Sequence, residues 1–208
     1  MCPSPERTRV NEPRLPTEFP FGRTLVTVAV GDLLAQGAEM IVLPANRRGV
    51  LGPLATPGLN GLRSLGGSEI EREAMAMAPL DLGTAVITGP AGLTQRGVAA
   101  VIHAAVHPSL GERARPEYVR RAVPAILNVA SAAPYYTLAL PLLGVDSTAN
   151  ADDTGAAITT LVNELIAALR RSYPRIDRIT IICRFESQAL LVRQALFQAR
   201  ERSWNRAS

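Results

Sequence analysis

Few residues of this chain have the types and spacing that metal binding or covalent catalysis requires. The sequence holds two histidines, His103 and His107, and two cysteines, Cys2 and Cys183. They are too few and too far apart for a zinc cluster or a disulfide framework. His103 and Cys183 lie inside apolar runs and are interpreted as buried core residues, whereas His107 follows such a run and could edge a cleft. We therefore expect no metal and no cofactor.

Groups that could bind a ligand gather in segments that follow strand-like runs. In sheets of parallel strands, ligands bind outside the carboxyl ends of the strands, where the N–H groups of helix N-termini face outward. Four segments of this chain have that position, and they cover residues 31–32, 44–61, 144–150 and 184–187.

Apolar strand-like runs alternate with helical patterns along the chain, which indicates a largely parallel or mixed sheet covered on both faces. Asp32 is a plausible N-cap of a short helix over 31–37, and Ser68 with Glu71 resembles a capping box. Pro141 suggests the carboxyl end of its strand. The predicted strands are 24–30, 40–43, 84–88, 98–106, 136–143 and 179–183, and the other predicted helices are 59–65, 68–78, 116–130, 151–171 and 187–200.

Length and composition fit one compact domain. The chain has 208 residues, of which 47% are hydrophobic and 19% are charged. We expect a flexible leader over residues 1–20, a folded domain over 21–200 and a short tail over 201–208. No apolar run approaches the length of a membrane span, so we expect a cytoplasmic protein without membrane contact. The basic residues are dispersed and the net charge is only +4, which argues against nucleic-acid binding.

An ordered set of motifs resembles the macrodomain family. VAVGDLLAQGAEMIVLPAN is similar to the family's opening, in which a strand is followed by Gly-Asp, a short helix, a second strand and an Asn-Ala-Ala-Asn type turn. LGTAVITGPAGLTQRGVAAVIHAAV, LALPLLGV and IICRFE follow in the family's order, so the resemblance covers about residues 22–200. It implies a three-layer α/β/α sandwich that binds ADP-ribose or a related nucleotide, free or linked to protein.

The resemblance also implies the ligand contacts. Asp32 matches the acidic residue that faces the adenine amino group, and Asn46 matches the last Asn of the turn beside the distal ribose; the first Asn of that turn is replaced by Leu43. Phe185 stands where many members place an aromatic ring against adenine, although a core role is an equal alternative. The full expected ligand set is Asp32, Leu33, Asn46, Gly58, Leu59, Asn60, Gly61, Gly144, Val145, Asp146, Ser147 and Phe185.

Both expected phosphate loops depart from the family pattern. Pro53 and Pro57 interrupt the Gly-rich run, and because proline has no N–H the loop offers fewer donors to a diphosphate. The second loop reads GVDSTAN and brings Asp146 near the expected phosphates, where like charges repel unless Asp146 points away, caps the next helix or bonds a ribose.

The resemblance leaves catalysis open. Hydrolases of the better-known class carry an Asp and a His on the helix after the Gly-rich loop, where this chain has Asn60 and Ser64, and neither is a general base near neutral pH. The principal hypothesis is a module that binds ADP-ribose. The alternatives are a hydrolase that removes ADP-ribose from proteins or deacetylates O-acetyl-ADP-ribose, with Asn46 as the candidate catalytic residue, and a scaffold whose altered loops bind another ligand, such as RNA, or none. The oligomeric state is not predicted.

Overall fold

The structure is a computed structural model that describes residues 15–51, 59–145, 151–171 and 175–204. Its sheet has seven strands in the order β1-β2-β7-β6-β3-β5-β4. The five central strands run parallel to one another, and β1 and β4 at the two edges run antiparallel to their neighbours. The mixed, largely parallel sheet expected from the sequence is therefore confirmed. The strands are β1 (Glu18–Phe21), β2 (Thr24–Val30), β3 (Met40–Asn46), β4 (Ala85–Thr88), β5 (Ala100–His107), β6 (Thr137–Pro141) and β7 (Arg178–Cys183).

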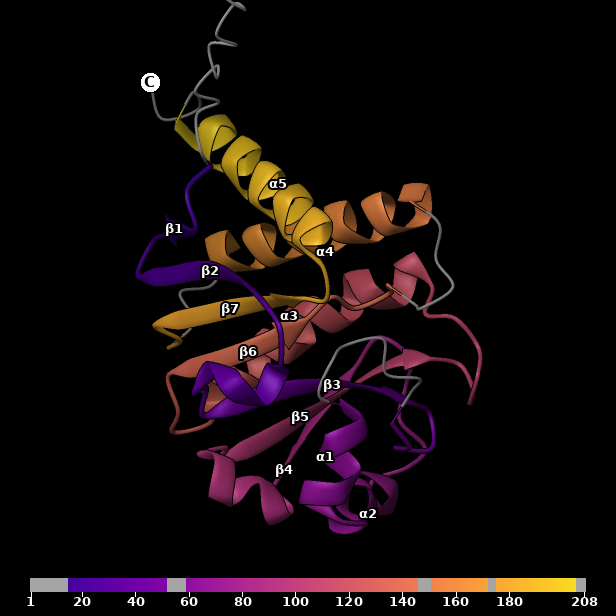
Figure 1. Cartoon of the computed structure of the whole chain (residues 1–208). Helices are drawn as coiled ribbons and strands as arrows, with labels where there is room; N and C mark the ends of the chain where they lie inside the picture. The colour runs from indigo at the N-terminus through magenta and orange to yellow at the C-terminus, as the bar shows by residue number, and fades with distance from the viewer. Residues whose placement is uncertain (1–14, 52–58, 146–150, 172–174, 205–208) are drawn as a thin grey trace, which may run out of the picture.

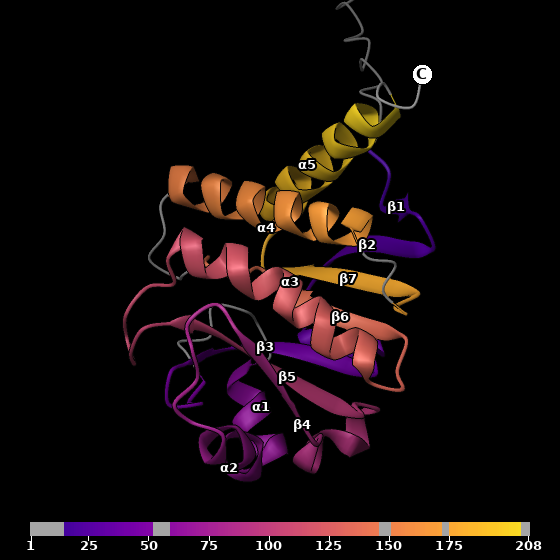
Figure 2. The same ribbon diagram turned by 180° about the vertical axis from the view of Figure 1, so that it is seen from behind.

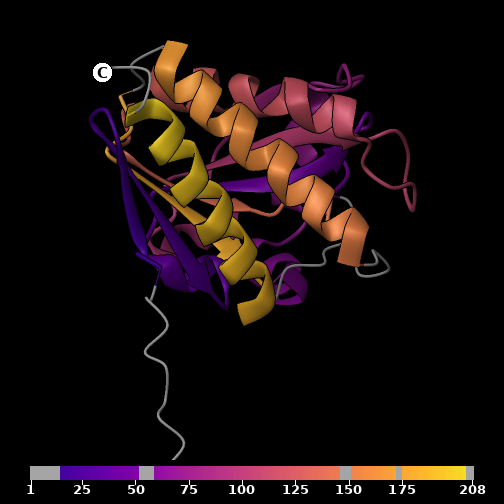
Figure 3. The ribbon, with the colours of Figure 1, turned by 90° about the horizontal axis from the view of Figure 1, so that it is seen from above.

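Helices cover both faces of the sheet, which completes the expected α/β/α sandwich. Three long helices pack on one face (Figure 2), and Figure 3 shows α4 and α5 next to one another there. The opposite face carries the short helices, including α1 and α2 (Figure 1). The long helices are α3 (Pro116–Ala132), α4 (Ala151–Arg171) and α5 (Glu186–Trp204); the short ones are α1 (Leu59–Gly66), α2 (Glu69–Ala76), and the 3₁₀ helices η1 (Leu33–Gln36) and η2 (Ala91–Arg96).

The strands divide the hydrophobic core into two parts. Successive side chains of β3 alternate, so that Met40 and Val42 join the cluster under the long helices while Ile41 and Leu43 join the cluster under the short ones. All eight residues of β5 are buried, as expected for a central strand covered on both faces. The positions of the strand ends are thus fixed by packing on two sides.

Local expectations are partly corrected. The sheet begins at Glu18 rather than near Phe21, and the fully buried Phe19 anchors β1 in the core. The turn expected over 89–97 contains η2. The predicted capping box is wrong, because Ser68 makes no side-chain cap hydrogen bond and the Glu71 carboxylate instead accepts from the backbone N–H of Leu51.

None of the helices in the described part of the chain combines the length and apolar character needed to cross a bilayer.

Candidate functional site

The candidate site lies along the carboxyl ends of the five parallel strands. We call this end of the sheet its carboxyl edge. β2, β7, β6 and β3 are consecutive neighbours, so their carboxyl ends form a continuous row. Asp32 follows β2, Phe185 follows β7, Gly144 follows β6, and Asn46 ends β3. From β2 to β3 the row spans three strand spacings, or ~14 Å.

Asp32 and Phe185 follow the ends of two strands that are hydrogen-bonded to each other. Val30 pairs with Cys183, and the N–H of Gly31 donates to the Cys183 carbonyl at 3.1 Å. Asp32 is the N-cap of η1, as predicted, with its Oδ1 accepting from the N–H of Leu34 at 2.9 Å. No group in the described part of the chain donates to Oδ2 of Asp32. Asp32 therefore keeps a second acceptor oxygen that receives no hydrogen bond from the described residues.

Phe185 is held by its backbone while its ring faces solvent. The Gln188 side-chain oxygen accepts from the N–H groups of Arg184, at 2.9 Å, and Phe185, at 3.3 Å, which caps the start of α5. Phe185 is 53% exposed, so the core role considered as an alternative is wrong. The Arg184 guanidinium lies 5.1 Å from the ring centroid, in the range of a cation–π contact.

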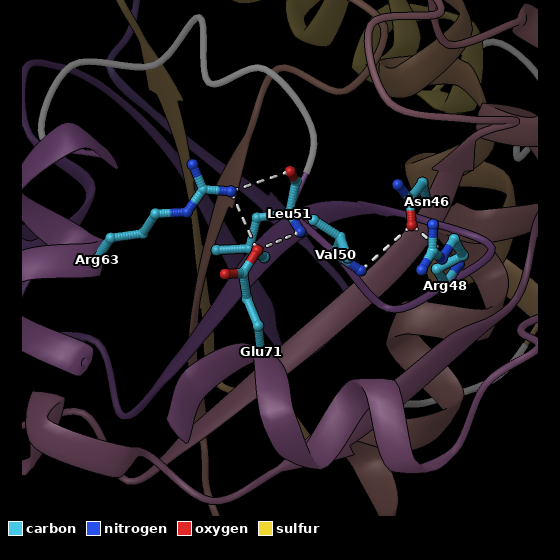
Figure 4. A network of polar contacts seen from close by, with 6 residues as sticks. All are labelled: Asn46, Arg48, Val50, Leu51, Arg63 and Glu71. Carbon is cyan, nitrogen blue, oxygen red and sulfur yellow. Dashed lines mark hydrogen bonds and ion pairs between the residues drawn. The ribbon is translucent and has the colours of Figure 1, made fainter. Parts of the chain in front are cut away.

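Asn46 is buried and shapes the turn that follows β3. Its Oδ1 accepts from the backbone N–H groups of Arg48, at 2.8 Å, and Val50, at 3.2 Å. The register between β3 and β5 shifts between Ala45 and Asn46, and such bulges re-aim side chains at strand ends. Figure 4 shows the carboxamide oxygen directed at these two N–H groups and the nitrogen directed away from them. Since the oxygen is engaged, Nδ2 is the group left to meet a ligand, and it can only donate.

The described parts of the expected phosphate loops lie between these residues. After β6 the chain turns at Gly144, which has φ 82°, and both Gly144 and Val145 are partly exposed. Leu33, also expected at the ligand, is instead 1% exposed and packs in the core below η1. Gly58, Asp146 and Ser147 lie outside the described residues, and for Leu59, Asn60 and Gly61 the description is limited to the helical backbone of α1.

A polar network that the sequence analysis missed lies beside Asn46. The Glu71 carboxylate, on α2, accepts from the N–H of Leu51 at 2.8 Å and from the Arg63 guanidinium, on α1, at 3.0 Å. The same guanidinium nitrogen lies 3.4 Å from the Leu51 carbonyl oxygen (Figure 4). The sequence pattern predicted that Glu71 would cap its own helix. The structure shows that its partners are Leu51 and Arg63, which lie outside that helix.

The histidines and the described cysteine are buried. His107 pairs with Asn46 across the sheet, but its Nδ1 lies 2.8 Å from the Glu112 carbonyl oxygen, to which only a protonated nitrogen can donate. His103 is fully buried. Its Nε2 lies 3.0 Å from the Thr88 hydroxyl oxygen, and its Nδ1 has no hydrogen-bond partner among the described residues. Burial lowers the pKa of His103 to about 4 and raises that of Cys183 to about 12, so the thiolate needed of a nucleophile is absent near neutral pH.

No group of three or more His, Cys, Asp or Glu side chains in the described ranges could hold a metal ion.

Comparison with known proteins agrees with this architecture. The family model described as Macro domain matches residues 42–158, which span β3 to the first half of α4. An uncharacterized protein of Aeropyrum pernix is 34% identical over 158 residues, covering 74% of this chain and 77% of that protein.

Two solved structures have the same fold at low identity. A macrodomain of Oceanobacillus iheyensis with MES bound has a TM-score of 0.72 and 16% identity, covering 89% of this chain and 97% of that one. A macrodomain of Trypanosoma brucei in complex with ADP-ribose has a TM-score of 0.66 and 18% identity, covering 82% of this chain and 68% of that one.

Proposed function

This chain belongs to the Macro domain family, and we propose that it is a module that binds ADP-ribose along the carboxyl edge of its sheet. In this arrangement Oδ2 of Asp32 accepts from the adenine amino group, and the exposed Phe185 ring stacks on the base. The Nδ2 of Asn46 donates to a hydroxyl of the distal ribose. The diphosphate lies between them, near the β6 turn and the N-terminus of α1, since helix N-termini favour anions.

One observation carries this proposal. An acceptor and an exposed ring stand together on two neighbouring strand ends, and a fixed donor stands on the strand end ~14 Å along the same row. A ligand with a base at one end and a sugar at the other matches this order of groups. The ADP-ribose complex of the similar Trypanosoma brucei macrodomain supports the choice of that ligand.

Binding is favoured over hydrolysis because this chain has no acid–base group at the position where the family's hydrolases carry their catalytic pair. Helix α1, where the family's hydrolases carry their pair, contains neither an acidic residue nor a histidine. The histidine that pairs with Asn46 in the sheet is His107. It is 3% exposed, and its Nδ1 lies within hydrogen-bond distance of the Glu112 carbonyl oxygen. Because its Nδ1 donates to the Glu112 carbonyl, the only nitrogen of His107 that could act as a base is Nε2.

Calorimetry with ADP-ribose tests the proposal directly. We expect saturable binding, and we expect Asp32→Ala to weaken ADP-ribose by about tenfold, the effect of losing one hydrogen bond to a charged group. Ribose 5-phosphate, which has no adenine, should bind both proteins equally. The absence of heat at millimolar ADP-ribose would exclude the function, and equal losses for both ligands would exclude the adenine assignment.

A further inference from the structure

We propose that the Arg63–Glu71 ion pair positions the first turn of α1 relative to Asn46, and thereby sets the affinity for the diphosphate–ribose part of the ligand without touching the ligand. This inference rests on the proposed binding of ADP-ribose. It assigns a positioning role to two residues that belong to helices α1 and α2 rather than to the strand ends.

Both backbone polar groups of Leu51 are held by this pair. Its N–H donates to Glu71, and its carbonyl oxygen faces Arg63. The Leu51 side chain is fully buried under the short helices, and its backbone forms an isolated bridge with Ala45 of β3. Leu51 is therefore a fixed point that connects the end of β3 to the two helices.

The network joins three segments that are separate in sequence. Asn46 controls the start of the turn after β3 through Arg48 and Val50, and the ion pair controls its end at Leu51. Arg63 lies four residues after Leu59, so it is about 6 Å along the helix axis from the start of α1. Because a helix is rigid over this length, fixing Arg63 fixes the backbone N–H groups that open α1.

Because the ion pair is partly buried, its loss should affect the turn after β3. The Glu71 side chain is 19% exposed and that of Arg63 is 51% exposed. A partly buried carboxylate needs its donors, because without them its desolvation is uncompensated. Loss of Arg63 therefore favours movement of the Glu71 carboxylate toward water, and either that movement or loss of Glu71 itself would release the N–H of Leu51.

Glu71→Ala is the main variant, and Glu73→Ala is its matched control. Glu73 is on the same helix and also accepts a backbone N–H, that of Gly89 at 2.9 Å, but it does not contact Leu51. We expect Glu71→Ala to weaken ADP-ribose by at least about tenfold and to leave adenosine, which occupies only the Asp32–Phe185 end, within about twofold. Glu71→Gln keeps an acceptor for Leu51 and should lose less than about threefold. Glu73→Ala should change neither affinity.

Hydrogen exchange of the Leu51 amide separates this inference from the proposed function. Glu71→Ala should accelerate that exchange while Glu73→Ala leaves it unchanged, whether or not a ligand binds. Equal losses of ADP-ribose and adenosine affinity, or equal effects of the Glu71 and Glu73 variants, would overturn the positioning role. If the unsubstituted protein binds no ADP-ribose, the proposed function fails, and unaltered Leu51 exchange in Glu71→Ala would refute the coupling by itself.

Discussion

In the proposed binding site, the two polar atoms of the Asn46 side chain have different roles. Its oxygen stabilises the turn after β3 by accepting two backbone N–H groups, and its nitrogen is left for a ligand. The residue type and position were predictable from the sequence, but the orientation of the carboxamide was not. Orientation depends on where Arg48 and Val50 place their N–H groups, which is a property of the folded turn.

Asn46→Asp separates these two roles. The aspartate keeps an oxygen for the two N–H groups but replaces the donor with a charged acceptor, which cannot donate to a ribose hydroxyl and repels the diphosphate. We expect the melting temperature to change little and ADP-ribose affinity to fall by at least about tenfold, measured by calorimetry. Asn46→Ala should lose both stability and affinity. Wild-type affinity in Asn46→Asp would contradict the donor role.

At the level of elements, the site depends on close contact between the turn after β3 and helix α2. Gly49 has φ 74°, and a Cβ placed on it would lie 2.6 Å from the carbonyl carbon and oxygen of Ala74, in the backbone of α2. The turn can approach this closely only because Gly49 has no side chain. The same approach brings Leu51 within reach of Glu71.

Gly49→Ala should therefore disrupt both the fold and the site. Left-handed strain and a backbone clash together predict a loss of about 2–4 kcal/mol in the free energy of unfolding. Gly37 is a matched control, since it has φ 63° but open space around its Cβ position, and Gly37→Ala should cost only about 1 kcal/mol. Urea denaturation measures both. Similar losses for the two variants would show that the contact with α2 is unimportant.

Sequence reasoning located the main strands because their apolar runs end at residues that interrupt a strand, such as Gly31 after β2 and Pro141 at the end of β6. It missed β1, a four-residue strand with a proline, whose formation depends on burial of Phe19 rather than on local preference. It placed Asp32, Asn46 and Phe185 at one edge because parallel strands end together. It could not find the role of Glu71, since a single sequence does not show whether this side chain caps its own helix or contacts a residue 20 positions away.

For the whole molecule, burial of His103 links stability to pH. The imidazole has a pKa of about 4 in the folded protein against 6.5 for an ordinary histidine. Between these values the unfolded chain binds a proton that the folded chain does not, so stability falls as the pH drops from 6.5 to 4. The shift corresponds to a loss of up to about 3 kcal/mol.

His103→Leu should remove this part of the pH dependence. Urea denaturation of both proteins between pH 7 and 4 should show a smaller fall in the free energy of unfolding for the variant. The comparison isolates His103 because carboxylate titrations contribute to both proteins alike. Parallel curves would mean that the folded protein accommodates the protonated imidazole.

Helix α5 runs away from the carboxyl edge of the sheet, where we propose that ADP-ribose binds. It starts directly after Phe185 and runs for 19 residues, which is about 28 Å. A reporter attached through Glu201→Cys, at an exposed position near the other end of the helix, would thus sit on the opposite side of the domain. The domain could be immobilised or labelled there with its recognition edge left open, which makes it a convenient starting point for a sensor.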